Sequence, residues 1–573
     1  MMRCTHSRRA RCGGDGCRRP PQRGARLLVL AVFAAAALLT EDALLAQPET
    51  AEAVLAAERA LLEERGATIG RVNITVENVF DPNNPDEDKP LYRWANRVHV
   101  RTRESVIESI LLFRPGDRFE ARLLEESARL LRARNFLAEA AVSHGQYDAA
   151  TNTVDVNVWV RDSWSLAPDL KLGRSGGENE FGIGVSDGNL LGLGKDLTVS
   201  YEEDVDRDET LVAYGDRNVR GTRVRLQTVL ANASDGHRRI LSAERPFFAL
   251  DTRWSLGGSV HDERRVDSMY DLGEVVDEFE HDIRALTLHG GWSRGYVAGR
   301  TLRWLGGLTF EEHRFAPAAD VPQPLLLPED RELVYPWVGF ELVYDDYREM
   351  RELNDMGRTE DISLGLNLSA SVGYSSDAFG ADRDAWIFRA GASKGWEPGG
   401  SGRLLLVETS AAARSEDGEL RNSVVSAAAR YYRRNLGRHL FTAQLAAVAS
   451  NRLDAENQVL LGGDNGLRGY PLRYQAGEHS AVLTLEQRFF TSWYPARLFR
   501  VGYAVFMDAG RVWGDDPRAT GGLGTLYDVG VGLRLSSPRS SGRSIVHIDL
   551  AFPLEGNSGI DGMQLLVETK ASF

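Results

Sequence analysis

The chain has 573 residues, of which 26% are charged and 43% hydrophobic, and its formal net charge is −14 at pH 7. This length leaves room for more than one folded unit, and the acidic balance argues against a nucleic-acid partner. After the N-terminal region no segment approaches the run of about eighteen apolar residues that a spanning helix needs. We therefore expect no helical anchor, and a membrane location would require a closed β-barrel.

Residues 1–46 have the pattern of an export signal. Eight arginines and a single acid lie in the first 26 residues, and an apolar run of thirteen residues follows at Leu27–Leu39. Such a run suits the hydrophobic part of a signal peptide and is too short to span a membrane. All three cysteines precede this run. Cleavage after Ala46 would leave a chain without thiols, which fits passage through an oxidising compartment.

The next segment, 47–68, is predicted to be a helical linker. Its residues 49–66 are rich in alanine, leucine and glutamate, which favours one short helix, and Gly66 ends it. A plug or signalling helix is an alternative interpretation, and a plain linker helix is the one that the composition favours.

Residues 69–163 are predicted to form a compact α+β module. The segment from Ile69 has a strand pattern, and an amphipathic stretch follows that Pro115 and Gly116 stop. A second helical stripe follows, and then two strands. The last strand alternates valine with polar residues from Val154 to Val160. One strand, two helices and a β-hairpin in about 95 residues are typical of a small α+β domain.

From residue 164 to residue 573 strand-length alternating segments replace the helical periodicity. The clearest is 361–376, DISLGLNLSASVGYSS, with apolar residues on one face and small polar residues on the other. That pattern fits a strand between lipid and a wet lumen. We predict an all-β transmembrane antiparallel barrel with an even strand number, 16 to 20, and our own count is twenty. Loop lengths should alternate between short and long.

The predicted long loops are Asp262–Glu280, Glu311–Glu332 and Asn451–His479, and one segment on the short side, Arg348–Glu360, is too long for a tight turn.

Four passages in the last third have a sharper pattern than alternation. They are 460–471, 480–490, 499–513 and the pair of terminal segments 528–538 and 544–554. The longest loop contains LLGGDNGLRGYP, with Arg468, Gly469 and Tyr470 near its end. The next strand has Glu486 on its inward face, and the strand after it has Asp508 and Gly510 on its inward face. A glycine-flanked acid lets a loop approach the wall closely. An arginine is its natural partner, because a guanidinium binds carboxylates through a planar fork.

These passages resemble the BamA-type superfamily of outer-membrane insertases, TamA-like translocation factors and two-partner secretion pores. The resemblance rests on RGY at 468–470, F-x-D-x-G at Phe506–Gly510, Glu486 and the two terminal strands. The turn DGNLLGLG at 187–194 and the module, which is similar to a single POTRA domain, extend it over most of the chain. It implies that the RGY loop folds into the lumen and that Arg468 bonds Asp508 and Glu486. The chain ends on Phe573, which we expect to act as an assembly signal.

Two further patterns are weaker. Residues 184–188 match the G-x-S-x-G hydrolase elbow, which requires a strand turning into a helix, whereas a Gly-Asn turn follows here. The acidic segment 81–88 lacks the glycine and ligand spacing of a calcium loop, and the eleven histidines show no metal-ligand grouping. We therefore predict no catalytic residue, no metal and no cofactor.

The function predicted from the sequence is assistance to the insertion or translocation of unfolded polypeptide, without enzymatic activity. The expected location is the outer membrane, with the module in the periplasm. The expected partners are unfolded outer-membrane or secreted polypeptides, outer-membrane lipid and periplasmic accessory proteins. A structural or lipid-handling barrel whose module tethers neighbours is the alternative, and a passive porin is the third. Substrate would leave either through the pore or through the seam between the first and last strands.

Overall fold

The computed structural model describes residues 49–319, 321, 323–398, 402–435, 439–520, 523–542, 545–555 and 560–570. The predicted signal segment, residues 1–46, and the predicted assembly signal, Phe573, lie outside the described residues. Within the described residues no helix combines the length and the apolar character that crossing a membrane requires.

The N-terminal module contains a three-stranded sheet. Its elements are α2 (Glu49–Glu64), β1 (Thr68–Glu77), α3 (Pro90–Val98), α4 (Glu104–Ile110), α5 (Ala121–Arg132), β2 (Leu137–Asp148) and β3 (Thr153–Asp162). The strand order is β1-β3-β2, with β1 parallel and β2 antiparallel to β3. Because β3 lies in the centre, every second residue from Val154 to Val160 is buried against the helices. Each such side chain stabilises the module by about 1.5–3 kcal/mol.

The helix α3 was not predicted. It is nine residues long, with Pro90 at its start, and its sequence follows a stretch rich in Asp, Asn and Pro. Such a short helix is marginal by itself, but Tyr92 and Ala95 are buried here and the Tyr92 ring stacks on Phe80 at 4.6 Å. Tertiary packing therefore determines this helix, and the local pattern does not.

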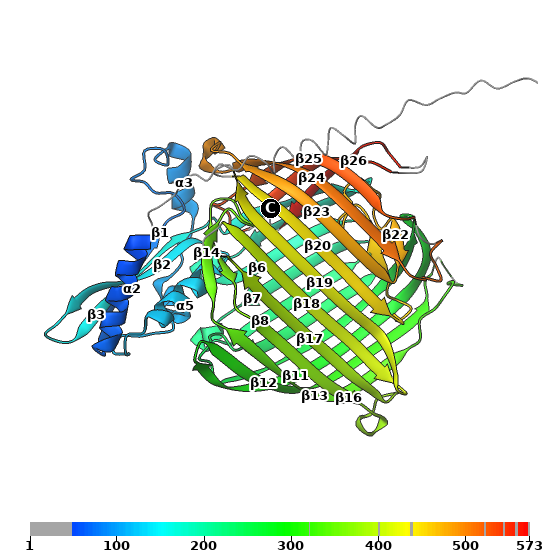
Figure 1. The fold of residues 1–573 in the computed structure, drawn as a ribbon, viewed down its shortest axis with the longest axis horizontal. Coiled ribbons are helices and arrows are strands. Elements are labelled where there is room, and N and C mark those ends of the chain that lie inside the picture. The colour runs from blue at the N-terminus through cyan, green and yellow to red at the C-terminus, as the bar shows by residue number, and fades with distance from the viewer. Residues whose placement is uncertain are drawn as a thin grey trace, which may run out of the picture. The chain divides into compact units, whose positions relative to one another are not determined.

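Twenty strands within the described residues form a closed antiparallel barrel, which confirms the predicted fold class. Their bounds are β4 Leu166–Ser175, β5 Glu178–Asp187, β6 Lys195–Glu203, β7 Asp208–Asp216, β8 Arg225–Ala233, β9 Gly236–Arg245, β10 Trp254–Asp271, β11 Glu274–Val297, β12 Arg300–Pro317, β13 Arg331–Tyr344, β16 Asn367–Ser375, β17 Ala385–Trp396, β18 Arg403–Glu416, β19 Glu419–Asn435, β20 His439–Asn451, β23 His479–Phe490, β24 Arg500–Trp513, β25 Leu526–Ser536, β26 Ile545–Pro553 and β27 Gln564–Lys570. The strands are strongly tilted (Figure 1), as closure of a sheet requires.

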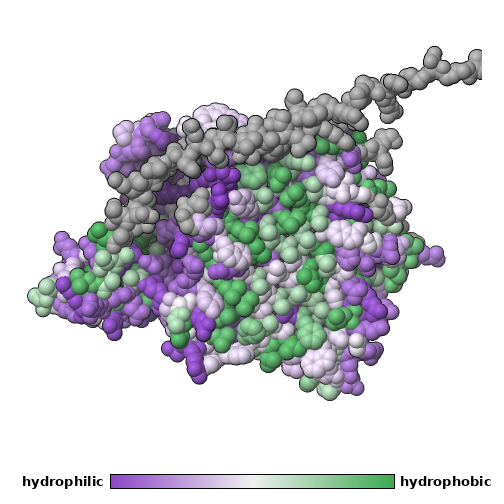
Figure 2. Space-filling model, in the orientation of Figure 1, coloured by the Kyte–Doolittle hydropathy of each residue, from purple (hydrophilic) through white to green (hydrophobic). Residues whose placement is uncertain are grey.

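The alternation along the strands separates an apolar outside from a polar inside. Large apolar residues such as Leu256, Leu288 and Val338 are exposed on the outer face. Figure 2 shows hydrophobic residues gathered over the barrel strands on the face that it presents. This surface suits a hydrocarbon environment.

Two sequence predictions about the barrel wall were wrong. The predicted loop Asp262–Glu280 is mostly strand, because β10 and β11 continue to a tight turn at Leu272 and Gly273, which have φ of +55° and +88°. Charged cross-strand pairs, such as Arg264 with Asp282, replace apolar residues there, so the hydrophobic alternation disappears while the ladder continues.

The segment 361–376 is not one strand. Its first part belongs to β15 (Thr359–Ser363), which pairs with β14 (Tyr347–Arg351) in a separate two-stranded sheet. Only its second part, β16, belongs to the barrel sheet. We call residues 347–363 the inner hairpin. It explains why the segment from Arg348 to Glu360 is too long for a turn.

Candidate functional site

The loop between β20 and β23 folds back on itself before it reaches Arg468. The short strands β21 (Val459–Leu461) and β22 (Gln475–Gly477) pair at its base. At its tip the Asn465 carboxamide oxygen accepts a hydrogen bond from the Gly462 amide at 2.6 Å. The buried Tyr470 hydroxyl hydrogen-bonds the carbonyls of Tyr527 and Glu555, at 2.9 and 2.7 Å. These bonds fix the backbone on both sides of Arg468.

Arg468 lies on the lumenal face of the wall and contacts three carboxylates. Its Nε and Nη2 donate to the two oxygens of Asp508 at 2.7 and 3.0 Å, which is the bidentate fork. Its Nη1 donates to Glu486 at 3.2 Å and to Asp549 at 3.1 Å. The guanidinium carbon also lies 3.3 Å from the centre of the Phe506 ring, a cation–π contact. All four charged side chains are buried.

Two further arginines complete the cluster. Arg488 donates to Glu486 at 2.8 Å, and Arg534 pairs with Asp549 and lies 3.4 Å from Glu486. Asp508 lacks such a second cation, since among the described residues its one basic partner is Arg468. We call these six residues the lumenal arginine cluster: Arg468, Glu486, Arg488, Asp508, Arg534 and Asp549. The six residues carry three positive and three negative charges, which compensate one another. The buried Asp528 lies directly opposite Asp508 in the ladder and adds a further carboxyl group beside the cluster.

Two glycines let the loop approach the wall. A Cβ on Gly510 would lie 2.8 Å from Leu461 and 3.3 Å from Leu467, both of which belong to the loop. A Cβ on Gly469 would lie 2.7 Å from the Cβ of Asp528, whose carboxylate accepts the Gly469 amide hydrogen bond at 3.0 Å. At Gly469 the Pro553 backbone nitrogen also lies at 3.0 Å, so a side chain there would push the loop, and Arg468 with it, away from the acids. At Gly510 the two leucine side chains would have to shift.

The inner hairpin packs against the lumenal face of the wall on the other side of the cluster. Leu353 and Met356 at its turn are buried against inward residues of β18, β19, β20, β23, β24 and β26. The Leu353 carbonyl accepts a hydrogen bond from Arg488 at 2.9 Å, and Arg358 donates to the carbonyls of Pro538 and Ser540. The inner hairpin therefore binds Arg488, and the loop binds Glu486, the partner of Arg488, through Arg468. Each of the two segments occupies part of the lumen.

The module contacts the inner hairpin through α5. Arg132 donates two hydrogen bonds to Asp361, at 2.8 and 2.5 Å, and one to Glu349 at 2.8 Å. Arg129 pairs with Asp345 at 3.1 Å just before the hairpin. The inner hairpin therefore contacts the module through ion pairs and the lumenal arginine cluster through the Leu353 carbonyl.

The wall is weakest between its first and last strands. Among the described residues, which end at Lys570, β4 and β27 share a single registered pair, Arg174 with Val567, whereas β4 and β5 share ten. Each backbone hydrogen bond contributes about 0.5–1.5 kcal/mol, so this seam opens at the lowest cost of any position along the described wall.

The structure brings together the residues that the sequence singled out. Arg468, Glu486 and Asp508 are in direct contact, and Gly469, Tyr470 and Gly510 position the loop. Sequence reasoning did not assign Arg534, Asp549 or Arg488 to the site. The available signal was a charge at an inward strand position, which Arg488 and Asp549 both carry. Among the described residues no group of His, Cys, Asp or Glu has an arrangement that could hold a metal ion.

The lumenal arginine cluster lies within the part of the chain that matches a known protein family. Residues 436–566, which contain every member of it, match the Omp85 superfamily domain. The matched residues include the loop, the cluster and the last strands of the barrel. No curated protein matches the chain by sequence.

Among solved structures, BamA from Haemophilus ducreyi lacking POTRA domains 1–3 is 12% identical, with a TM-score of 0.40 over 93% of this chain and 96% of that one. CdiB from Acinetobacter baumannii is 13% identical, with a TM-score of 0.43 over 87% and 73%. The FrpB iron transporter from Neisseria meningitidis is 9% identical, with a TM-score of 0.37 over 90% and 96%. Likenesses at this level do not distinguish one class of barrel from another.

Proposed function

We propose that this Omp85-domain barrel assists the insertion of unfolded polypeptide into the outer membrane, with substrate leaving through the β4–β27 seam. The observation that carries the proposal is the single registered pair between Arg174 and Val567. A seam with few backbone hydrogen bonds presents unpaired donors and acceptors, onto which an incoming strand can add.

The segments that occupy the lumen favour exit of the substrate through the seam rather than through the pore. The loop that bears Arg468 and the inner hairpin both occupy it, and buried charges hold both in place. Removing these two segments to pass a polypeptide would break several buried ion pairs, at on the order of 3–5 kcal/mol each. Opening the seam breaks one registered pair among the residues that the structure describes.

The module would capture the substrate on the periplasmic side. In the three-stranded sheet β2 is an edge strand, and no strand among the described residues pairs with its outer side. An extended segment can bind there through main-chain hydrogen bonds, which demand little of its sequence. The module would then deliver the segment to the barrel.

A cross-link across the seam tests this function. In Arg174→Cys/Val567→Cys the cysteines lie opposite each other in the ladder, within disulfide range. The segment from residue 47 has no native cysteine to interfere. The matched control is Val185→Cys/Val199→Cys, on paired strands of the continuous wall. Purified variants in phospholipid vesicles would receive a urea-unfolded barrel protein, and heat-modifiable migration would report its insertion.

We expect wild type and the oxidised control to accelerate insertion and the oxidised seam variant to lose the acceleration until dithiothreitol restores it. Equal acceleration by the locked and unlocked seam would refute exit through the seam. A wild-type protein that does not accelerate insertion would refute the function itself.

A further inference from the structure

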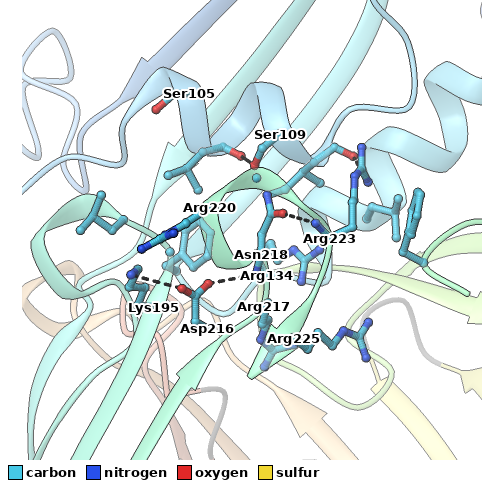
Figure 3. A pocket seen from close by; sticks show the side chains of 18 residues that line it. Ser105, Ser109, Arg134, Lys195, Asp216, Arg217, Asn218, Arg220, Arg223 and Arg225 are labelled. Carbon is cyan, nitrogen blue, oxygen red and sulfur yellow. Dashed lines mark hydrogen bonds and ion pairs between the residues drawn. The ribbon is translucent and has the colours of Figure 1, made fainter. Parts of the chain in front are cut away.

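A cavity of about 410 Å³ lies between the module and the rim of the barrel nearest to it. Figure 3 shows residues of its walls, which come from α4 and the end of α5 on one side and from the barrel connections after β5, β7 and β9 on the other. We call it the rim cavity. Its apolar lining consists of Val106, Ile110, Leu130, Leu193, Phe136 and Phe248.

The polar lining of the rim cavity is strongly basic. Six of its side chains are cationic, and one, Asp216, is anionic. The cations are Arg134, Lys195, Arg217, Arg220, Arg223 and Arg225. Lys195 is neutralised by Asp216 at 3.2 Å. The other nearby acids are more distant, since Asp196 lies 3.6 Å from Arg217 and Glu244 lies 3.6 Å from Arg225. A surplus of positive charge therefore remains.

The surplus of positive charge affects the pKa of Arg134, which lies in the cavity lining. Burial and the nearby guanidiniums of Arg217, Arg225 and Arg223 lower the pKa of Arg134 to about 10. Like charges that oppose one another in a partly buried space favour the binding of an anion, because an anion removes the repulsion.

The basic side chains are not required by the turn that carries them. The turn between β7 and β8 repeats the one between β5 and β6, with Asp216 and Asn218 at the positions of Asp187 and Asn189. In both turns the asparagine oxygen accepts a hydrogen bond at 2.7 Å from the amide five residues on.

Yet the second turn has arginine at each of three positions where the first has another residue. Arg217, Arg220 and Arg223 replace Gly188, Leu191 and Gly194. Arg223 has φ of +63°, a left-handed conformation for which Gly194, at +66°, is the unstrained choice. The Arg223 guanidinium donates to the Leu111 carbonyl of the module at 2.7 Å, so this residue joins the turn to the module. Arg217 and Arg220 are the two arginines of this turn that remain for a ligand of the rim cavity.

The rim cavity also reaches the lipid-facing perimeter of the barrel. Lys195 and Asp216 are cross-strand partners, and they share the outer face of β6 and β7 with Val199 and Val212, which are exposed. A group bound between the ends of these strands would therefore lie at the height of the lipid headgroups.

We propose that the rim cavity binds the phosphate group of an anionic phospholipid from the leaflet next to the module. The arginines would hold the phosphate, since a guanidinium matches phosphate oxygens in a fork geometry, and the apolar lining would cover the glycerol and the first part of an acyl chain. The site is separate from the seam and does not depend on the proposed insertion of polypeptide. A bound lipid would join the module to the barrel.

Native mass spectrometry of the full chain in detergent, titrated with phosphatidylglycerol, tests the site. We expect one tightly bound lipid per chain, with zwitterionic phosphatidylcholine binding at least tenfold more weakly. Arg217→Gln/Arg220→Gln should raise the dissociation constant about tenfold or more, and Arg220→Gln by itself about threefold. The matched control is Arg294→Gln, which removes an exposed arginine of β11 near its end on the same rim, outside the cavity. It should leave the constant within twofold.

Competition with inorganic phosphate and glycerol 3-phosphate identifies the source of the phosphate. If either displaces phosphatidylglycerol at equal concentration, the ligand is free phosphate and the assignment to lipid is refuted. If Arg220→Gln and Arg294→Gln weaken binding equally, or if phosphatidylcholine binds as tightly as phosphatidylglycerol, the rim cavity is not the site. Heat-modifiable migration of each variant confirms that the barrel has folded.

Discussion

Replacing Arg468 by alanine should destabilise the barrel by on the order of 3–5 kcal/mol, because a buried ion pair that loses one partner leaves an uncompensated charge. Most of this loss of stability should come from Asp508, which would be left without a basic partner within the described part of the chain. Glu486 would keep Arg488 at 2.8 Å, and Asp549 would keep Arg534. Asp508 would lose both of its guanidinium hydrogen bonds, at 2.7 and 3.0 Å.

The converse change should cost less. In Asp508→Ala the guanidinium of Arg468 keeps Glu486 at 3.2 Å and Asp549 at 3.1 Å, so we expect a loss of about 1–3 kcal/mol. The double change Arg468→Ala/Asp508→Ala should cost less than the sum by at least about 1 kcal/mol, since contacting residues are not additive. Arg468→Lys should restore stability only in part, because an ammonium group cannot form the planar fork.

Urea-induced unfolding in detergent micelles, followed by circular dichroism and heat-modifiable migration, measures the four free energies of the cycle. The matched control is the exposed pair of Arg430 and Glu408, at 3.2 Å on the same barrel, for which we expect a coupling of about 0.2–1 kcal/mol. A coupling between Arg468 and Asp508 no larger than that of the control, with Arg468→Ala close to wild type, would refute the reasoning.

Three further predictions concern the loop that bears Arg468, the inner hairpin and the C-terminus. Gly469→Ala should destabilise the loop by about 1–3 kcal/mol, because the added methyl would meet Asp528 at 2.7 Å, whereas Gly562→Ala meets open space and should change urea stability by less than about 0.5 kcal/mol. Replacing residues 352–358 by two glycines should raise the single-channel conductance in planar bilayers, and an unchanged conductance would mean that the inner hairpin does not narrow the pore. Deleting Phe573 should lower the amount of protein in the outer membrane, which a quantitative membrane blot measures against full-length chain.

Much of the architecture follows from local patterns. Alternation with a period of two determines which side of a strand faces the lumen, so the inward position of Glu486 and Asp508 could be derived from spacing alone. The glycine at 510 and the fork geometry of Arg468 then predict a contact between loop and wall. The structure contains that contact.

The same reasoning failed where polarity replaced periodicity. The strands β10 and β11 extend as charged ladders in which Arg264 pairs with Asp282, and their sequence resembles that of a loop. The segment 361–376 failed for the opposite reason, since its apolar alternation continues from β15 of the inner hairpin into β16 of the wall. A period of two identifies extended backbone but not the sheet to which it belongs.

The sequence by itself determined the closed barrel, its even number of strands, the inward facing of the acids and the arginine that meets them, because these depend on local periodicity and on residue chemistry. Only the tertiary structure decided that Arg534 and Asp549 join the cluster, that the inner hairpin lies in the lumen and that arginines of one turn face the module across the rim cavity. These contacts depend on the stagger between neighbouring strands and on where long connections return. Both arise from closure of the whole sheet, which no single segment of sequence encodes.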